Sequence, residues 1–201
     1  MWLKRAKKRL GKTSGLLLIT MQIDSIFDQL FGEIYGMPAW RVSPGWGSFL
    51  TLEFGDPHLE IREPIAARES VSERVKQDLA RRRIFIHGDW HLWIYCCDWE
   101  VFAGGQLIGQ STSEATIQKA ADILDGQKLI GFSMTAEPLR CRFEFDLNGR
   151  LETHPYDGES EQWLFYDSRN HMVLILRADG VYSYGRSDRS DEKEWKPVQI
   201  P

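Results

Sequence analysis

The sequence predicts an α+β fold that is largely an antiparallel β-meander, in one sheet or more, with two or three covering helices. Apolar and polar residues alternate along several short segments that are separated by glycine turns, which is typical of strands with one buried face. Apolar residues at helical spacing are confined to a few short stretches. The 201 residues are 42% hydrophobic and 27% charged, so the chain can bury a core without disulfide bonds.

Charge is distributed unevenly along the chain. The formal net charge is −4, yet residues 1–20 carry six lysines or arginines and no acid, which leaves −10 for the rest. Such an acidic body repels the phosphate backbone that dominates nucleic-acid affinity, so nucleic-acid binding is not expected. Instead, the body suits a basic protein partner of unknown identity.

Composition also bears on location. Three cysteines, of which two are adjacent, do not form a secreted disulfide framework. No stretch approaches the roughly 18 apolar residues of a membrane span. We therefore expect a cytoplasmic protein without a membrane span or a cofactor; its oligomeric state is left open.

Four regions are predicted along the chain. Residues 1–20 form a basic N-terminal segment that is expected to precede the fold. Residues 21–125 hold a helix, a β-unit and a connecting helix. Residues 126–188 form a C-terminal β-meander that packs with the first part as one globular unit, and residues 189–201 form a polar tail.

The first predicted helix begins just after Met21. Its apolar stripe has the spacing i, i+3, i+4, i+7, i+8 and i+11, and consists of Ile23, Ile26, Phe27, Leu30, Phe31 and Ile34. Gly36 and Pro38 are expected to end it. The stripe predicts a helix that covers the core.

The segment 50–61 predicts a β-hairpin or a bent antiparallel pair. Apolar residues alternate from Leu50 to Phe54, a turn follows at 55–57, and a second alternating run continues to Ile61. Each run is expected to have one buried face and one face in water. Residues 68–83 have apolar residues only at four-residue intervals in a charged background, which indicates a short helix or a mobile connection.

The stretch "HGDWHLWIYCCDWEV", residues 87–101, is apolar at both odd and even positions through its middle. This pattern predicts a central strand that is covered on both faces. Cys96 and Cys97 then point to opposite faces and are expected to pack as small hydrophobic residues.

The C-terminal half predicts a second helix and a meander. Ser111 and Glu114 form a capping-box pattern, and a helix with a buried face is expected to follow and to end at Gly126. From residue 128 to 184, alternating segments are separated by Asn-Gly and Asp-Gly turns, as in β-hairpins. Residues 48–61 and 140–153 share the order strand, glycine turn, strand, which leaves open whether the chain contains two related β-units.

His87 and His91, with Asp89 between them, are the candidate metal ligands. On a helix, two histidines four residues apart can chelate zinc. On a strand, four residues span ~13 Å, which is too far for one ion. We therefore expect no metal site, unless Gly88 bends the chain so that His87, Asp89 and a distant residue converge.

Paired acids and exposed tryptophans are the other candidates. The acids are Asp98 with Glu100 and Glu144 with Asp146. Two facing carboxylates can act as general acid and base, but Arg140 and Arg142 share the face of the second pair, so surface ion pairs account for it more simply. Trp40 and Trp46 flank "RVSPG", a predicted loop that could present aromatic rings to a partner.

Two segments resemble known groups of proteins. "WGSFLTLEFG" followed by "WHLWIYCCDW" resembles an uncharacterised bacterial domain family over roughly residues 45–110, and these motifs are structural strands without a catalytic assignment. Residues 126–185 are similar in pattern to small β-rich domains of toxin-immunity proteins. The second likeness implies an immunity-type protein that binds a basic toxin.

The function expected from these observations is that of a non-catalytic protein-interaction module. The sequence has no phosphate-binding loop, no G-x-S-x-G and no H-E-x-x-H motif, and no convergent site is evident. The alternative is an unrecognised hydrolase or metal-dependent enzyme, in which His87, Asp89 and His91 act together with a nearby carboxylate such as Asp98.

Overall fold

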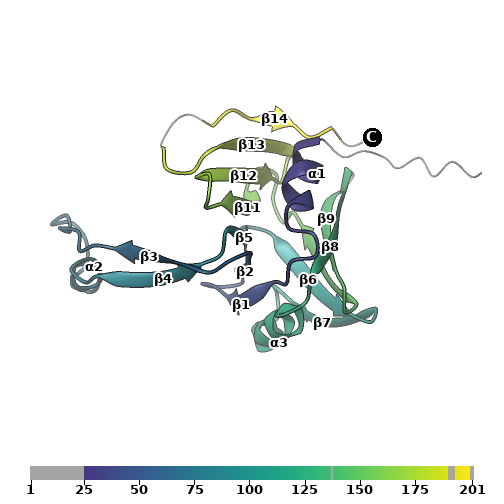
Figure 1. Cartoon of the computed structure of the whole chain (residues 1–201), viewed down its shortest axis with the longest axis horizontal. Helices are drawn as coiled ribbons and strands as arrows, with labels where there is room; N and C mark the ends of the chain where they lie inside the picture. The colour runs from purple at the N-terminus through teal and green to yellow at the C-terminus, as the bar shows by residue number, and fades with distance from the viewer. Residues whose placement is uncertain (1–24, 137, 190–192, 200–201) are drawn as a thin grey trace, which may run out of the picture.

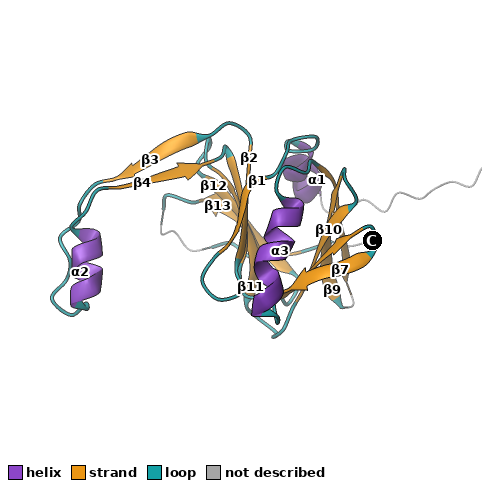
Figure 2. Cartoon of the chain, turned by 90° about the horizontal axis from the view of Figure 1, so that it is seen from below, coloured by secondary structure: helices purple, strands orange, loops and turns teal. Residues whose placement is uncertain are grey.

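Two antiparallel sheets pack face to face, and a separate two-stranded ribbon projects away from them (Figures 1 and 2). This computed structural model describes residues 25–136, 138–189 and 193–199, so the predicted basic segment 1–20 lies outside the described residues. The described chain contains three helices, and strands predominate, which confirms the predicted β-rich α+β class. None of its helices is long and apolar enough to cross a bilayer.

The first sheet has seven strands. In spatial order they are β1 (Trp40–Pro44), β2 (Leu50–Phe54), β5 (Trp90–Ile94), β11 (Glu161–Asp167), β12 (Met172–Arg177), β13 (Val181–Arg186) and β14 (Lys196–Pro197). Each neighbouring pair is antiparallel. The central strands are buried on the face that meets the second sheet. β14 lies within the expected polar tail, where Trp195 packs against a small cluster on the outer face of the sheet.

The second sheet has five strands. In spatial order they are β7 (Gln106–Gln110), β6 (Asp98–Ala103), β10 (Gly149–His154), β9 (Leu139–Phe145) and β8 (Leu129–Ala136). Asn148 adopts a φ of 65° between β9 and β10, in agreement with the predicted Asn-Gly hairpin. Both sheets contain strands from each side of residue 125.

Helix α1 (Ser25–Gly32) fills the space between the two sheets with the predicted apolar stripe from Ile26 to Phe31. The helix ends before the expected stop at Gly36, so Ile34 follows it in a turn, and Ile23 lies outside the described residues. The Phe31 ring stacks on Phe132 of β8 at 4.2 Å and on Phe165 of β11 at 4.8 Å between ring centroids. Phe27 packs beside it, against Trp163 of β11. One short helix therefore joins the two sheets through aromatic contacts.

Helix α3 (Glu114–Leu124) has the buried face that the sequence predicts, but its cap differs. Its buried residues are Ile117, Ala120, Ala121 and Leu124. The N-cap is Ser113, so the predicted capping box at Ser111 is wrong. The Ser111 hydroxyl instead accepts the Trp99 N–H and donates to Asp98. Ser111, which the sequence pattern assigned to the helix cap, therefore stabilises the start of β6 through these hydrogen bonds.

The prediction of one central strand over 87–101 is wrong. The stretch forms β5 in the seven-stranded sheet and β6 in the five-stranded sheet, and the chain crosses between the sheets at 95–97. Even positions are buried in β5, and odd positions are buried in β6. The buried positions therefore change from even to odd between the two strands. This change, rather than burial on both faces of one strand, explains why both even and odd positions are apolar.

The predicted hairpin at 50–61 is also wrong. β2 pairs with β1 and β5, whereas His58–Arg62 forms β3, which pairs with β4 (Arg83–His87). All five residues of β3 are exposed, so the second run has no buried face. Helix α2 (Glu73–Leu79) lies at the far end of this β3–β4 ribbon (Figure 2).

The two faces of β5 predict different costs of truncation. Ile94 is fully buried between the sheets, whereas Trp93 is half-buried on the outer face against Phe49 and Tyr95. We expect Ile94→Ala to lower the free energy of unfolding by about 2–5 kcal/mol, and Trp93→Ala to lower it by less. Urea denaturation measures both values. Equal large losses would contradict the assignment of the odd face to the surface.

Candidate functional site

Residues 58–87, comprising β3, α2 and β4, form an arm that extends from the body (Figures 1 and 2). In its register, Leu59 lies opposite Ile86 and Ile61 lies opposite Ile84, so these four side chains share one face. Each is 43–63% exposed. We call them the apolar face of the arm. Because an isolated two-stranded ribbon is at best marginally stable in water, this face indicates a contact surface.

The opposite face of the arm borders a groove. Phe85 and His87 of β4 lie on this face, and the Arg62 guanidinium lies 5.0 Å from the centroid of the Phe85 ring. His91 and Tyr166 on the seven-stranded sheet line the other wall. The groove has a volume of about 580 Å³ and is open to solvent. It follows the junction between the arm and the body.

A glutamate and two histidines meet at this groove, where His87 and His91 line the wall and Glu53 is buried beside them, and we call them the Glu53 cluster. Glu53 on β2 is only 4% exposed. Its Oε1 lies 2.8 Å from His91 Nδ1 and 3.6 Å from His87 Nδ1. Its Oε2 accepts the Gly88 N–H at 2.9 Å. The two imidazole rings are 6.1 Å apart, in a T-shaped arrangement.

Gly88 brings the two histidines together. A Cβ at this position would lie 2.3 Å from the Phe54 carbonyl oxygen, so only glycine allows the chain to turn here between β4 and β5. His87 and His91 therefore belong to different strands, and the ~13 Å separation expected for one continuous strand does not apply. The ligand atoms of the Glu53 cluster all lie within 4.8 Å of one another.

Asp89 does not join the two histidines. Its Oδ2 accepts the Asp56 N–H at 3.0 Å, across the point where the arm leaves the sheet. Gly55 packs beside this carboxylate, with a φ of 77°. Asp89 thus stabilises the point where the arm leaves the sheet, which we call the root of the arm. The sequence predicted that Asp89 would lie beside the two histidines, and Glu53 occupies that position instead. Glu53 was missed because it lies on the polar side of an alternating strand, where exposure is expected.

The electrostatic environment keeps Glu53 ionised. Burial acts to raise the pKa of its carboxyl group. The hydrogen bond and the charge interaction with His91, together with the Gly88 N–H, more than offset that effect, so the pKa of Glu53 is lower than its usual value. At neutral pH the cluster therefore has a buried carboxylate with two imidazole neighbours.

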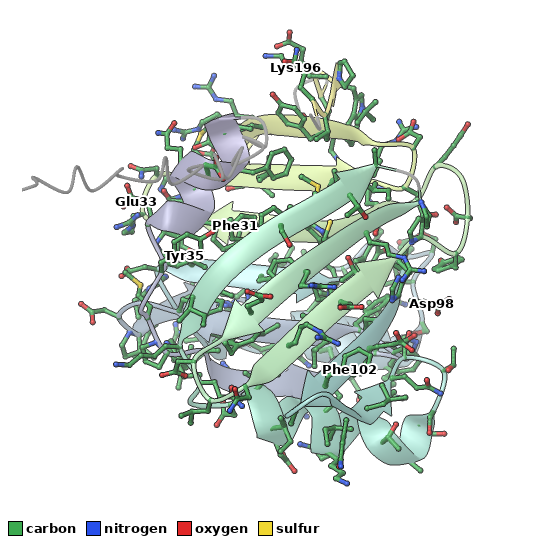
Figure 3. All side chains as sticks on the ribbon, turned by 90° about the vertical axis from the view of Figure 1, so that its right-hand side faces the viewer. Phe31, Glu33, Tyr35, Asp98, Phe102 and Lys196 are labelled. Atoms are coloured by element: carbon green, nitrogen blue, oxygen red, sulfur yellow. The ribbon has the colours of Figure 1, made fainter. Side chains whose placement is uncertain are left out.

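A second cluster lies on the outer face of the five-stranded sheet, the face seen in Figure 3. Glu100 Oε2 lies 3.3 Å from His154 Nε2. Glu152 forms ion pairs with Arg142 at 3.1 Å and with Arg150 at 2.9 Å. These arginines balance the charge of the acids, so the arrangement is that of a surface ion-pair network.

The predicted carboxylate pairs do not assemble with His87 and His91 of the Glu53 cluster. Asp98 accepts the Ser111 hydroxyl at 3.0 Å and, like Glu100, lines a different groove. Glu144 is exposed on β9, and Asp146 accepts the Lys128 N–H at 2.9 Å. None of the acids in these predicted pairs therefore lies beside His87 and His91, as the alternative enzyme hypothesis requires.

The two candidate tryptophans have different environments. The predicted loop between them is partly strand β1, and the Trp40 indole N–H donates to the Gly55 carbonyl oxygen at 3.0 Å. Trp46 is 89% exposed in the turn after β1. Trp40 thus has a structural contact at the root of the arm, whereas Trp46 presents its ring to solvent.

The cysteines lie apart from the groove and two of them are buried. Burial raises the pKa of the Cys97 thiol well above its usual value, and it raises the pKa of Cys141 to about 12. Because the thiolate is the reactive form, we expect both thiols to be unreactive in the native protein. This environment agrees with a packing role.

Compared with protein-family models, with curated proteins and with solved structures, the chain shows no match. The resemblances noted in the sequence therefore stay predictions.

Burial predicts the accessibility of the three thiols. In the native protein we expect a disulfide reagent such as DTNB to modify Cys96 rapidly, and Cys97 and Cys141 only on unfolding, because both are buried with raised pKa values. Absorbance at the thionitrobenzoate band measures the reaction. Cys96→Ser should abolish the fast phase; a fast phase of more than one thiol in the native protein would contradict the burial.

The close approach of Gly88 predicts a further effect on stability. Gly88→Ala should lower the free energy of unfolding by about 1–3 kcal/mol, since its methyl group has no room beside the Phe54 carbonyl. Thermal or chemical unfolding measures the loss. Gly158→Ala is the matched control, because no atom lies within 4 Å of the added Cβ. Equal stability of the two variants would contradict a tight turn at Gly88.

Proposed function

We propose that this protein is a non-catalytic protein-interaction module that docks through its arm, and that the partner at the arm is a second copy of the same chain. The proposal keeps the class of function expected from the sequence. It places the contact surface on residues 58–87 rather than on the predicted loop between Trp40 and Trp46. The observation that carries it is the apolar face of the arm, which projects into solvent on a ribbon of only two strands.

The apolar face suits a flat, self-complementary contact. Leu59, Ile61, Ile84 and Ile86 form two directly opposed pairs on neighbouring strands, and no other element of the described chain covers them. Homodimers most often have a two-fold axis that brings the same patch of each copy together. Two such ribbons packed face to face would bury both sets of side chains, and this burial would stabilise a ribbon that is marginal on its own.

Charge favours a second copy over another protein. Residues 62–83, at the far end of the arm, contain seven basic and four acidic side chains, a net charge of +3 in a chain whose net charge is −4. In an antiparallel arrangement of two arms, each basic tip lies beside the acidic body of the other copy. The basic partner expected for the acidic body is then the tip of the partner's own arm.

A charged substitution on the apolar face tests this proposal. We expect the full chain to be a dimer in solution and Ile61→Glu or Ile84→Glu to raise the dissociation constant of the dimer at least tenfold. Burial of an isoleucine contributes about 1.5–3 kcal/mol, and about 1.4 kcal/mol corresponds to a factor of ten. Sedimentation equilibrium measures the constant, and added salt should also raise it, because salt screens the attraction between tip and body.

Leu147→Glu is the matched control. Leu147 is 67% exposed at the turn between β9 and β10, far along the chain from the arm, so this variant should dimerise as the natural protein does. Circular dichroism checks that each variant is folded. A natural protein that is monomeric at every attainable concentration, or a Leu147→Glu variant that dissociates as readily as Ile61→Glu, would contradict docking through the arm.

A further inference from the structure

We propose that Glu53, His87 and His91 bind one divalent transition-metal ion of the zinc type at the root of the arm, with a coordination position open to the groove. The proposal is independent of dimer formation. It also reverses the expectation from the sequence that the chain holds no metal, because that expectation assumed a continuous strand between the two histidines.

The positions of the ligand atoms fit one ion. Imidazole nitrogens and carboxylate oxygens bind zinc at about 2.0–2.2 Å, so two ligand atoms of a tetrahedral site lie about 3.3 Å apart. The Oε1 atom of Glu53 lies 2.8 Å from His91 Nδ1 and 3.6 Å from His87 Nδ1. The two distances bracket the tetrahedral value, and the ligand atoms of the three residues all lie within 4.8 Å of one another, so binding of one ion requires side-chain rotations that draw them together.

The surrounding groups orient these ligands as in known metal sites. Metal-binding histidines usually donate their second ring N–H to a carboxylate or carbonyl group. His87 Nε2 lies 3.1 Å from Glu60 Oε2 on β3, which leaves Nδ1 free to face Glu53. The second carboxylate oxygen of Glu53 accepts the Gly88 N–H at 2.9 Å, which leaves Oε1 for the ion.

The charge of the cluster also favours a cation. A buried carboxylate has to be paired with a cation or coordinate a metal, and within the described residues the ion pairs of Glu53 are with His87 and His91, not with a lysine or arginine. A bound metal ion would take the place of the protons on these two imidazoles. The second cluster differs in this respect, because two guanidinium groups already pair with Glu152. The two clusters contain similar ligand types. Because the described arginines form ion pairs only with the second cluster, the Glu53 cluster is the better candidate for a metal site.

Ligand chemistry indicates the class of metal. Two imidazoles and one carboxylate suit zinc and its neighbours in the first transition series, whereas calcium and magnesium prefer sites made of oxygen ligands. The chain supplies three ligands, and two of them, His87 and His91, line the groove between the arm and the sheet, so the open fourth position is expected on the side of the groove. The ion would join β4 of the arm to β2 and β5 of the body and thereby fix the angle of the arm.

Titration of the metal-stripped full chain with zinc chloride tests the proposal. Calorimetry should show one equivalent of zinc bound, and the melting temperature should rise with zinc. His87→Ala and His91→Ala should lower the affinity at least 100-fold, because each removes a ligand. Cobalt chloride serves as a second probe, and a tetrahedral visible spectrum should appear in the natural protein and disappear in both variants.

Three further variants test whether zinc binds at the Glu53 cluster and not elsewhere on the chain. His154→Ala should bind zinc as the natural protein does, because His154 belongs to the second cluster. Glu60→Gln, which changes an exposed side chain, should lower the affinity about 10–100-fold through His87 without affecting the fold. Ile61→Glu should keep its zinc affinity even when it prevents dimer formation, so failure of one proposal is distinguishable from failure of the other.

The outcomes that overturn the metal site are equally specific. The first such outcome is that the natural protein shows no saturable binding of zinc. Binding that survives in folded His87→Ala and His91→Ala, or that is lost in His154→Ala instead, is another. Circular dichroism of each variant establishes that it is folded before its affinity is compared.

Discussion

The stacking of Phe31 between Phe132 and Phe165 is the contact on which the arrangement of the two sheets depends. Phe31 belongs to helix α1, Phe132 to the five-stranded sheet and Phe165 to the seven-stranded sheet. Two packed sheets lie about 10 Å apart, and the aromatic rings of α1, β8 and β11 occupy that space. Strands β5 and β6, which connect the sheets through residues 95–97, are positioned on this core, and so is the outer face that carries the groove.

Much of the fold could be predicted from local pattern, whereas strand pairing could not. Alternation located the strands of the C-terminal half and the apolar stripe located α1, because both depend on neighbours within a few residues. Alternation shows which face of a strand is buried, but not which strand lies beside it. Residues 50–54 and 58–62 therefore resemble one hairpin in sequence, although their partners are β5 and β4. The change of sheet at 95–97 is hidden for the same reason.

The candidate site could be predicted only in part. Residue type singles out His87 and His91, and Gly88 between them allows the bend that joins them. The third member, Glu53, was out of reach, because its strand pairs with β5 across a long stretch of chain and its side chain is on the face where polar residues are common. Alternation predicts a buried face for residues 58–62; only the pairing of β3 with β4 shows that this face is exposed.

The route of the chain into and out of the arm has a consequence for folding. Phe54 and Trp90 are paired neighbours in the sheet, so the chain leaves the sheet at one position and returns beside it after residues 55–89. Closing so long a loop before β2 and β5 can pair costs roughly 1–2 kcal/mol more in chain entropy than closing a tight turn. Pairing of β3 with β4 divides this loop, because it closes residues 63–82 separately and brings the two ends of 55–89 together. Contacts that stabilise the arm therefore also favour the pairing of β2 with β5.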